Sequence, residues 1–144
     1  MANARKVTAE AVDAFNAHDE GWMRSLYADR VVLEAPGEGR LEGADAAVDY
    51  MLRWLRAFPD ASVTIDGEIA DGDRVAHRLI LEGTQTNTFV GRTDEIPATH
   101  RPLRLEAAAL TQVKDRRITE LQLFFDQSDV LIQLGLVPEL ASSA

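Results

Sequence analysis

The stretch LRLEAAALTQVKDRRITELQLFF, residues 103–125, decides the fold. Two runs in which apolar and polar residues alternate, 103–113 and 118–125, flank a short polar turn. Because successive side chains of a strand point to opposite faces of a sheet, this alternation predicts two neighbouring strands that share an apolar face. The odd-numbered residues form that face, with Ala109 and Leu123 among them.

Two more strands are predicted upstream, because the period of two already begins after residue 60. The first strand has the apolar residues Val63, Ile65 and Ile69. The second has Val75, Leu79 and Leu81 on one face, and His77 is in phase with them. A turn at residues 71–73 joins the two strands, and a polar loop at 91–100 separates them from the decisive stretch.

Helices are predicted before the strands. The clearest is Ala44–Phe58, which has apolar residues at helical spacing on one side, charged residues on the other, and Pro59 at its end. The remaining predicted elements are helices at 8–18 and 19–27, a short strand at 31–33, and a last helix that begins at Asp126. Helices followed by a strand meander predict an α+β domain, in which helices cover one face of a curved antiparallel sheet.

Composition narrows the classes of function. The 144 residues fit a single domain, 1–144. With 24 acidic and 15 basic residues the net charge is −9, which argues against nucleic acid or an anionic membrane as a partner. The absence of cysteine excludes a thiol nucleophile, a disulfide and a thiolate metal site. No apolar run suits a membrane span or a signal peptide, so we expect a cytoplasmic protein.

Several short strings resemble, in order and spacing, the SnoaL-like polyketide cyclases of the nuclear transport factor two-like superfamily. They are AFPDASVTI (57–65), DGDRV (71–75), EGTQTNTFVG (82–91), IPATHRP (96–102) and QLG (133–135). The resemblance implies a cone, in which helices wrap a curved sheet around a deep apolar pocket. It also implies an enzyme that uses no metal or organic cofactor and assembles as a dimer or tetramer.

The chain departs from this family at the catalytic positions. Aligned back from QLG (133–135), the Asp that the cyclases carry in the last strand falls on Leu123, and its His partner falls on Ala109. Both residues are apolar and both lie on the face predicted to point inward. The resemblance therefore implies the family fold with a divergent site.

Three residues are candidates for acid–base chemistry. His77 shares its strand face with aliphatic residues and suits a general base or a hydrogen-bond donor, since histidine titrates near neutral pH, although a core histidine satisfied by a backbone carbonyl fits as well. Asp126 matches an Asp of the family beside the last strand, but it also suits a helix N-cap. Glu34 can act as a base at the pocket mouth, whereas strand alternation from Leu33 turns it outward.

An apolar ligand would be held mainly by burial, with few polar contacts. The candidate ligand-binding residues are Phe15, Met51, Trp54, Leu79, Gln85, Ala109 and Leu123. Gln85 is the polar member of this set, and its amide can orient a ligand carbonyl because it both donates and accepts hydrogen bonds. Tyr50, Trp54 and Phe58 lie one helical turn apart, which suits core packing or a subunit contact as well as ligand stacking.

Two functions remain open. The first is cofactor-free acid–base catalysis on an apolar polyketide-type or polycyclic molecule, by cyclisation, dehydration, isomerisation, epoxide opening or hydroxylation. The second is a non-catalytic subunit for small-molecule binding or assembly on the same fold. Even-numbered strand residues form a second apolar face, which predicts a homodimer; they are Ala76, Ile80, Ala108, Leu110, Ile118 and Phe124. The odd-with-odd strand pairing also predicts a turn of odd length with a positive φ at Arg116.

Overall fold

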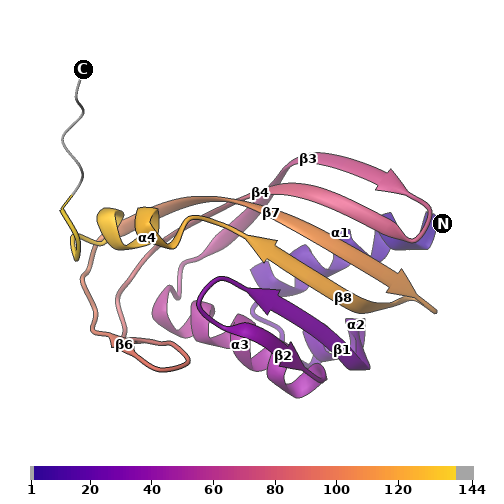
Figure 1. Ribbon diagram of the computed structural model, residues 1–144, viewed down its shortest axis with the longest axis horizontal. Coiled ribbons are helices and arrows are strands. Elements are labelled where there is room, and N and C mark those ends of the chain that lie inside the picture. The colour runs from indigo at the N-terminus through magenta and orange to yellow at the C-terminus, as the bar shows by residue number, and fades with distance from the viewer. Residues whose placement is uncertain (1, 139–144) are drawn as a thin grey trace.

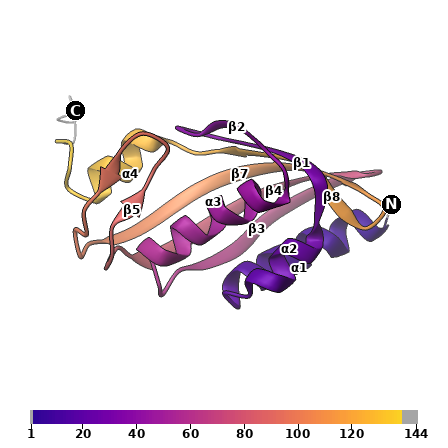
Figure 2. The ribbon, with the colours of Figure 1, turned by 90° about the horizontal axis from the view of Figure 1, so that it is seen from below.

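A computed structural model describes residues 2–138 of the chain. Its elements are α1 (Ala2–Asn16), α2 (Glu20–Leu26), β1 (Tyr27–Ala35), β2 (Gly39–Glu42), α3 (Ala44–Ala57), β3 (Ser62–Asp71), β4 (Arg74–Thr84), β5 (Phe89–Val90), β6 (Glu95–Ile96), β7 (Pro102–Lys114), β8 (Arg117–Phe124) and α4 (Gln127–Gln133). Figures 1 and 2 show α1, α2 and α3 on one face of a curved sheet, with α4 and the β5–β6 hairpin at one end. No helix of this described part is long and apolar enough to cross a membrane.

The described strands form a six-stranded sheet in the order β2-β1-β8-β7-β4-β3, and β5 pairs only with β6. The α+β architecture with helices on one face is as predicted. The sheet differs from the predicted antiparallel one at a single pair, because β1 and β8 run parallel. These strands are the first and the last long ones of the chain, and β8 enters the sheet between β1 and β7 rather than at its edge.

Local sequence signals account for several helix ends. Asp19 caps α2 by accepting a hydrogen bond from the backbone N–H of Trp22 at 3.0 Å. α3 ends at Ala57, just before Pro59. The structure also adds elements that the alternation pattern does not indicate, since β2 pairs with the end of β1, and the β5–β6 hairpin includes part of the predicted loop at 91–100.

A β-bulge in β3 inverts the facing of its second half. Ile65 pairs with Leu79, but the next paired residue is Gly67, which lies opposite Arg78, so that Asp66 is the extra residue. Beyond the bulge the even-numbered residues face inward. Val63, Ile65 and Ile69 belong to one strand as predicted, but Ile69 lies beyond the bulge and is 75% exposed.

The β7–β8 hairpin combines a two-residue turn with a second bulge. Asp115 and Arg116 have φ values of 50° and 64° and lie between the paired residues 114 and 117, as in a type I′ turn. The positive φ at Arg116 is as predicted, but the odd-length turn is wrong. The odd-with-odd pairing arises instead from a register shift that leaves Thr119 unpaired. The same shift turns Ile118 inward, so its predicted place on the outer face is wrong.

Candidate functional site

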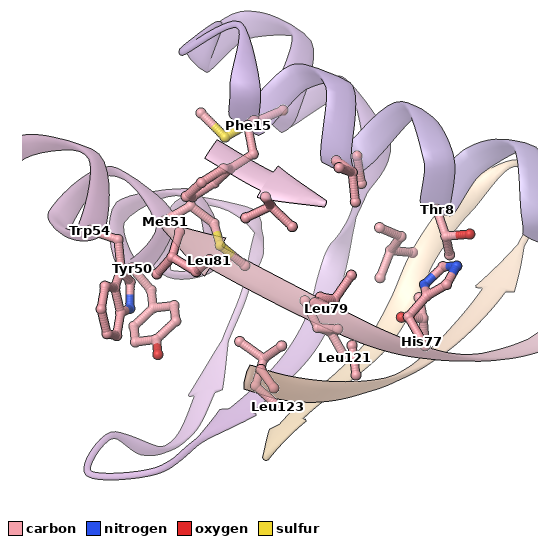
Figure 3. Close-up of a pocket in the computed structure, with 18 of the residues that line it drawn as sticks. Thr8, Phe15, Tyr50, Met51, Trp54, His77, Leu79, Leu81, Leu121 and Leu123 are labelled. Carbon is pink, nitrogen blue, oxygen red and sulfur yellow. The ribbon is translucent and has the colours of Figure 1, made fainter. Parts of the chain in front are cut away.

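An apolar cavity of about 140 Å³ lies between the concave face of the sheet and the helices α1 and α3. Six of the seven predicted ligand-binding residues line this inner cavity, and they are Phe15, Met51, Trp54, Leu79, Ala109 and Leu123. Figure 3 shows His77 and Thr8 at one end of it and Tyr50 and Trp54 at the other. The alternation in β4, β7 and β8 places these side chains, because it turns one apolar face of each strand toward the helices.

Ala109 and Leu123 lie directly opposite each other on β7 and β8. Both side chains line the inner cavity, as the strand alternation predicts. At the two positions where the resemblance places the ionisable pair of the cyclases, this chain therefore presents only aliphatic surface.

A second cavity of about 450 Å³ adjoins the first on the side of α4 and the β5–β6 hairpin. Tyr50, Trp54 and Phe125 line both cavities. The Trp54 ring lies in the middle of an aromatic group, with centroid distances of 4.8 Å to Phe89 and 5.8 Å to Phe125, both in edge-to-face geometry. The boundary between the inner and outer cavities is thus made of aromatic side chains.

His77 is the predicted catalytic residue that reaches the inner cavity. It is buried on β4, and its Nε2 lies 2.8 Å from Oε1 of Glu68 on β3. The pairing exists because the bulge at Asp66 places Glu68 directly opposite His77 with its side chain inward. Strand alternation did not identify Glu68 as a site residue, because it assumes a strand without a bulge. Gly67 is the sequence signal that could have revealed the bulge, since an isolated glycine inside a strand often marks one.

Glu68 is held in its ionised form. Hydrogen bonds from His77 and then from Arg5, whose Nε lies 2.7 Å from Oε2, lower the pKa of the Glu68 carboxyl group. An ionised carboxylate only accepts hydrogen bonds, so the proton in the His77–Glu68 bond belongs to Nε2. In the neutral ring Nδ1 then carries the lone pair, as a general base requires.

The other two predicted catalytic residues lie elsewhere. Asp126 is exposed and caps α4, because its Oδ1 accepts hydrogen bonds from the backbone N–H groups of Ser128 at 2.8 Å and Asp129 at 3.3 Å. Glu34 lies on β1 between the buried residues Leu33 and Ala35, so its side chain points away from the core. Neither is among the described residues that line the two cavities.

Gln85 does not contribute to either cavity in the described part of the chain, contrary to the prediction. It is fully buried, and its side-chain amide donates to the carbonyls of Ile96 and Pro97 at 3.0 and 3.3 Å. Its Oε1 accepts from the backbone N–H and the hydroxyl of Thr99 at 3.2 and 2.7 Å. The amide is therefore used to hold the loop that precedes β7, which satisfies a buried polar group without any ligand.

Tyr50 is another polar side chain that sequence reasoning did not assign to the site. Its side chain on α3 is 2% exposed, and its hydroxyl has no hydrogen-bond partner among the described residues. Burial raises the pKa of the Tyr50 hydroxyl to about 12. The helical spacing of Tyr50 and Trp54 left packing, a subunit contact and ligand stacking open, and the lack of a partner for the hydroxyl becomes visible only in three dimensions.

Comparison with known proteins agrees with this architecture. The sequence profile of the SnoaL-like polyketide cyclases matches residues 6–134. A comparison with curated protein sequences gives no significant match.

Solved structures with the same fold include three named for different reactions. IdmH from Streptomyces antibioticus, a proposed polyketide cyclase, is 27% identical with a TM-score of 0.78, over 92% of this chain and 98% of its own. AclR from Streptomyces galilaeus, a proposed hydroxylase, is 22% identical with a TM-score of 0.81, over 97% and 89%. An LEH-like epoxide hydrolase from M. tuberculosis is 19% identical with a TM-score of 0.72, over 93% and 90%. With the profile match extending over most of its length, this chain belongs to the SnoaL-like polyketide cyclase family.

Proposed function

We propose that this protein is a cofactor-free enzyme that binds an apolar polycyclic or polyketide-type molecule and transfers a proton with His77. The observation that carries the proposal is the His77–Glu68 pair at the end of an apolar cavity. Such a cavity holds its ligand mainly by burial and uses few polar groups for orientation. A buried histidine oriented by a carboxylate is the arrangement that general base catalysis needs.

The roles of the residues follow from the geometry. Nδ1 of His77 accepts a proton from a carbon next to a carbonyl group, and the ring becomes a cation. The ionised Glu68 at Nε2 stabilises that cation and keeps the ring in one orientation. Arg5 favours the charged form of Glu68 from the far side. Return of the proton to another atom of the same ligand gives isomerisation. Attack by the carbanion on a second carbonyl carbon of the ligand gives cyclisation, and the carbonyl oxygen, now an alkoxide, takes the proton back from His77.

The volumes of the two cavities limit the ligand. An apolar cavity of about 150 Å³ accommodates benzene, so the inner cavity of about 140 Å³ suits a single ring. Further rings would extend past Tyr50, Trp54 and Phe125 into the outer cavity of about 450 Å³. A ligand with two or more fused rings is therefore the class that uses both spaces.

Deuterium exchange into 2-tetralone, a fused-ring ketone with acidic C–H bonds beside its carbonyl, tests the proposal. In D2O the protein should accelerate the exchange, which NMR follows directly. The His77→Gln variant should lose about 10²-fold or more of this rate with little change in melting temperature. His18→Gln, the same substitution at an exposed histidine, is the matched control and should exchange normally.

A non-catalytic binding protein is the second candidate, and the aliphatic pair Ala109 and Leu123 favours it. In that case 2-tetralone would bind, but the exchange rate would not exceed the rate without protein. A His77→Gln variant that melts far lower yet exchanges at the wild-type rate would assign His77 a structural role.

A further inference from the structure

We propose that the Tyr50 hydroxyl is a ligand-binding group, which donates a hydrogen bond to an oxygen atom of the ligand where the inner and outer cavities meet. This inference rests on the proposed function, because it assumes an apolar ligand in the same site. It adds a second polar anchor to that site, remote from the carbon atom on which His77 acts.

The first argument is the isolation of this hydroxyl. A buried polar group without a partner costs free energy, so native structures rarely contain one unless it has a role. Tyr50 Oη has no hydrogen-bond partner among residues 2–138, although its side chain is almost fully enclosed. An oxygen atom of a bound ligand would supply the missing partner.

The second argument concerns the charged neighbours of Tyr50, which are occupied with each other. Arg53 lies with its guanidinium carbon 5.4 Å from the centroid of the Tyr50 ring. Its Nη2 is 2.5 Å from Oε1 of Glu38, and Oε2 of Glu38 accepts from the backbone N–H of Arg92 at 3.0 Å. Glu38 is therefore already engaged by Arg53 and Arg92, and none of these three residues hydrogen-bonds to the phenol oxygen.

The third argument is position. Tyr50 lines both cavities together with Trp54 and Phe125, so any ligand that extends from one cavity to the other passes beside its ring. Figure 3 places Tyr50 and His77 at opposite ends of the inner cavity. The oxygen bound by Tyr50 is consequently not the carbonyl oxygen next to the reacting carbon, but a second oxygen on another ring.

The protonation state suits a donor. Because burial raises the pKa of Tyr50 to about 12, the phenol keeps its proton at neutral pH. A phenol O–H donates to a carbonyl, ether or hydroxyl oxygen, and all three are acceptors. The ligand class is thus a fused-ring ketone that carries an additional oxygen substituent on the ring distant from the ketone.

Two tetralones of nearly equal size test this assignment. In 6-hydroxy-2-tetralone the distant ring carries an oxygen, and in 6-methyl-2-tetralone a methyl group takes its place. Quenching of tryptophan fluorescence gives both dissociation constants, since Trp54 lines the site. In Tyr50→Phe the affinity for the hydroxy compound, relative to the methyl compound, should fall about 3- to 10-fold, as expected for one neutral hydrogen bond.

Tyr27→Phe is the matched control, because Tyr27 is a second buried tyrosine that lines the inner cavity. It should leave the preference for the hydroxy compound unchanged, and so should His77→Gln. An unchanged preference in Tyr50→Phe, or its loss in either control variant, would overturn the assignment while the proposed function stands. If neither tetralone binds to the wild-type protein, the assignment and the proposed function both fail.

Unfolding of the ligand-free proteins provides an independent measurement. Tyr50→Phe removes only an oxygen atom that has no partner, so it should be at least as stable as the wild-type protein in urea. A clear loss of stability would mean that the hydroxyl is already satisfied inside the protein, which would contradict a role reserved for a ligand.

Discussion

Replacing Glu68 by Gln tests how the carboxylate acts on His77. In the wild-type protein Nε2 of His77 lies 2.8 Å from Oε1 of Glu68. The substitution keeps the size of the side chain and an oxygen that can accept this hydrogen bond, but it removes the negative charge. That charge matters most after Nδ1 has taken up a proton, because the bond to Glu68 then joins a cation to an anion. The variant should therefore react more slowly while it still binds its ligand.

The size of the effect follows from the exposure of the pair. A hydrogen bond to a charged group contributes about 1.5–3 kcal/mol. The Glu68 side chain is 22% exposed and is shared with the exposed Arg5, so solvent weakens its field and the lower end of this range applies. A loss of about 1.5 kcal/mol in the transition state corresponds to a rate about tenfold lower.

Deuterium exchange into 2-tetralone measures this rate, and Asp66→Asn is the matched control. Asp66 lies in the same strand, but its carboxylate is on the outer side of the sheet, 2.7 Å from Nη1 of Arg78. The control variant should exchange like the wild-type protein. Equal rates for the two variants would refute the assigned role of Glu68.

Nitrogen NMR of the His77 ring tests the same reasoning without any ligand. The wild-type ring should carry its proton on Nε2, since Glu68 can only accept. A ring that carries the proton on Nδ1 instead would leave no lone pair at that atom, and the proposed base would be wrong.

Three further predictions concern the fold. Arg116→Gly should raise the free energy of unfolding in urea by up to about 1 kcal/mol, because glycine tolerates the φ of 64° without strain; a clear destabilisation would contradict this account of the turn. We propose that Leu110 and Phe124, both exposed on the outer face, form a homodimer interface. Light scattering should then give a mass of twice 15.9 kDa, and Phe124→Glu should lower this measured mass. A wild-type species of 15.9 kDa at micromolar concentration would refute the interface. The folded state lowers the pKa of Glu68 below 4.5, so this group stabilises the protein above pH 4.5 and loses its contribution as the pH falls below that value. Glu68→Gln should therefore flatten the acid side of the stability profile, and an unchanged profile would contradict the pairing.

Alternation alone predicted most of the part of the cavity wall that β4, β7 and β8 supply. Leu79, Ala109 and Leu123 line the cavity because long stretches of β4, β7 and β8 keep a strict period of two. The same reasoning does not hold for Ile69 and Ile118, because a bulge separates each of them from the rest of its strand and shifts the period by one residue. A bulge moves the side chains on one side of it to the opposite face of the sheet. The pattern of apolar residues indicates only weakly where such a bulge occurs.

The site residues divide into those that strand alternation predicted and those that depend on tertiary structure. His77 was predicted to face the cavity, but its partner Glu68 required the bulge to be known. Gln85 was placed at the pocket from its position in a family string, whereas its hydrogen bonds to a distant loop depend on tertiary structure. Tyr50 stands out because of a missing partner, and a missing contact leaves no trace in a sequence.

The extra residue in β3 also affects how related chains are compared. A chain that lacks the counterpart of Asp66 would present the residue before or after its glutamate to the histidine, although every other residue of the strand could be the same. An alignment that places its gap elsewhere in the strand would match Glu68 to an outward-facing position. Gain or loss of a single residue here can thus add or remove a carboxylate beside the histidine without any substitution.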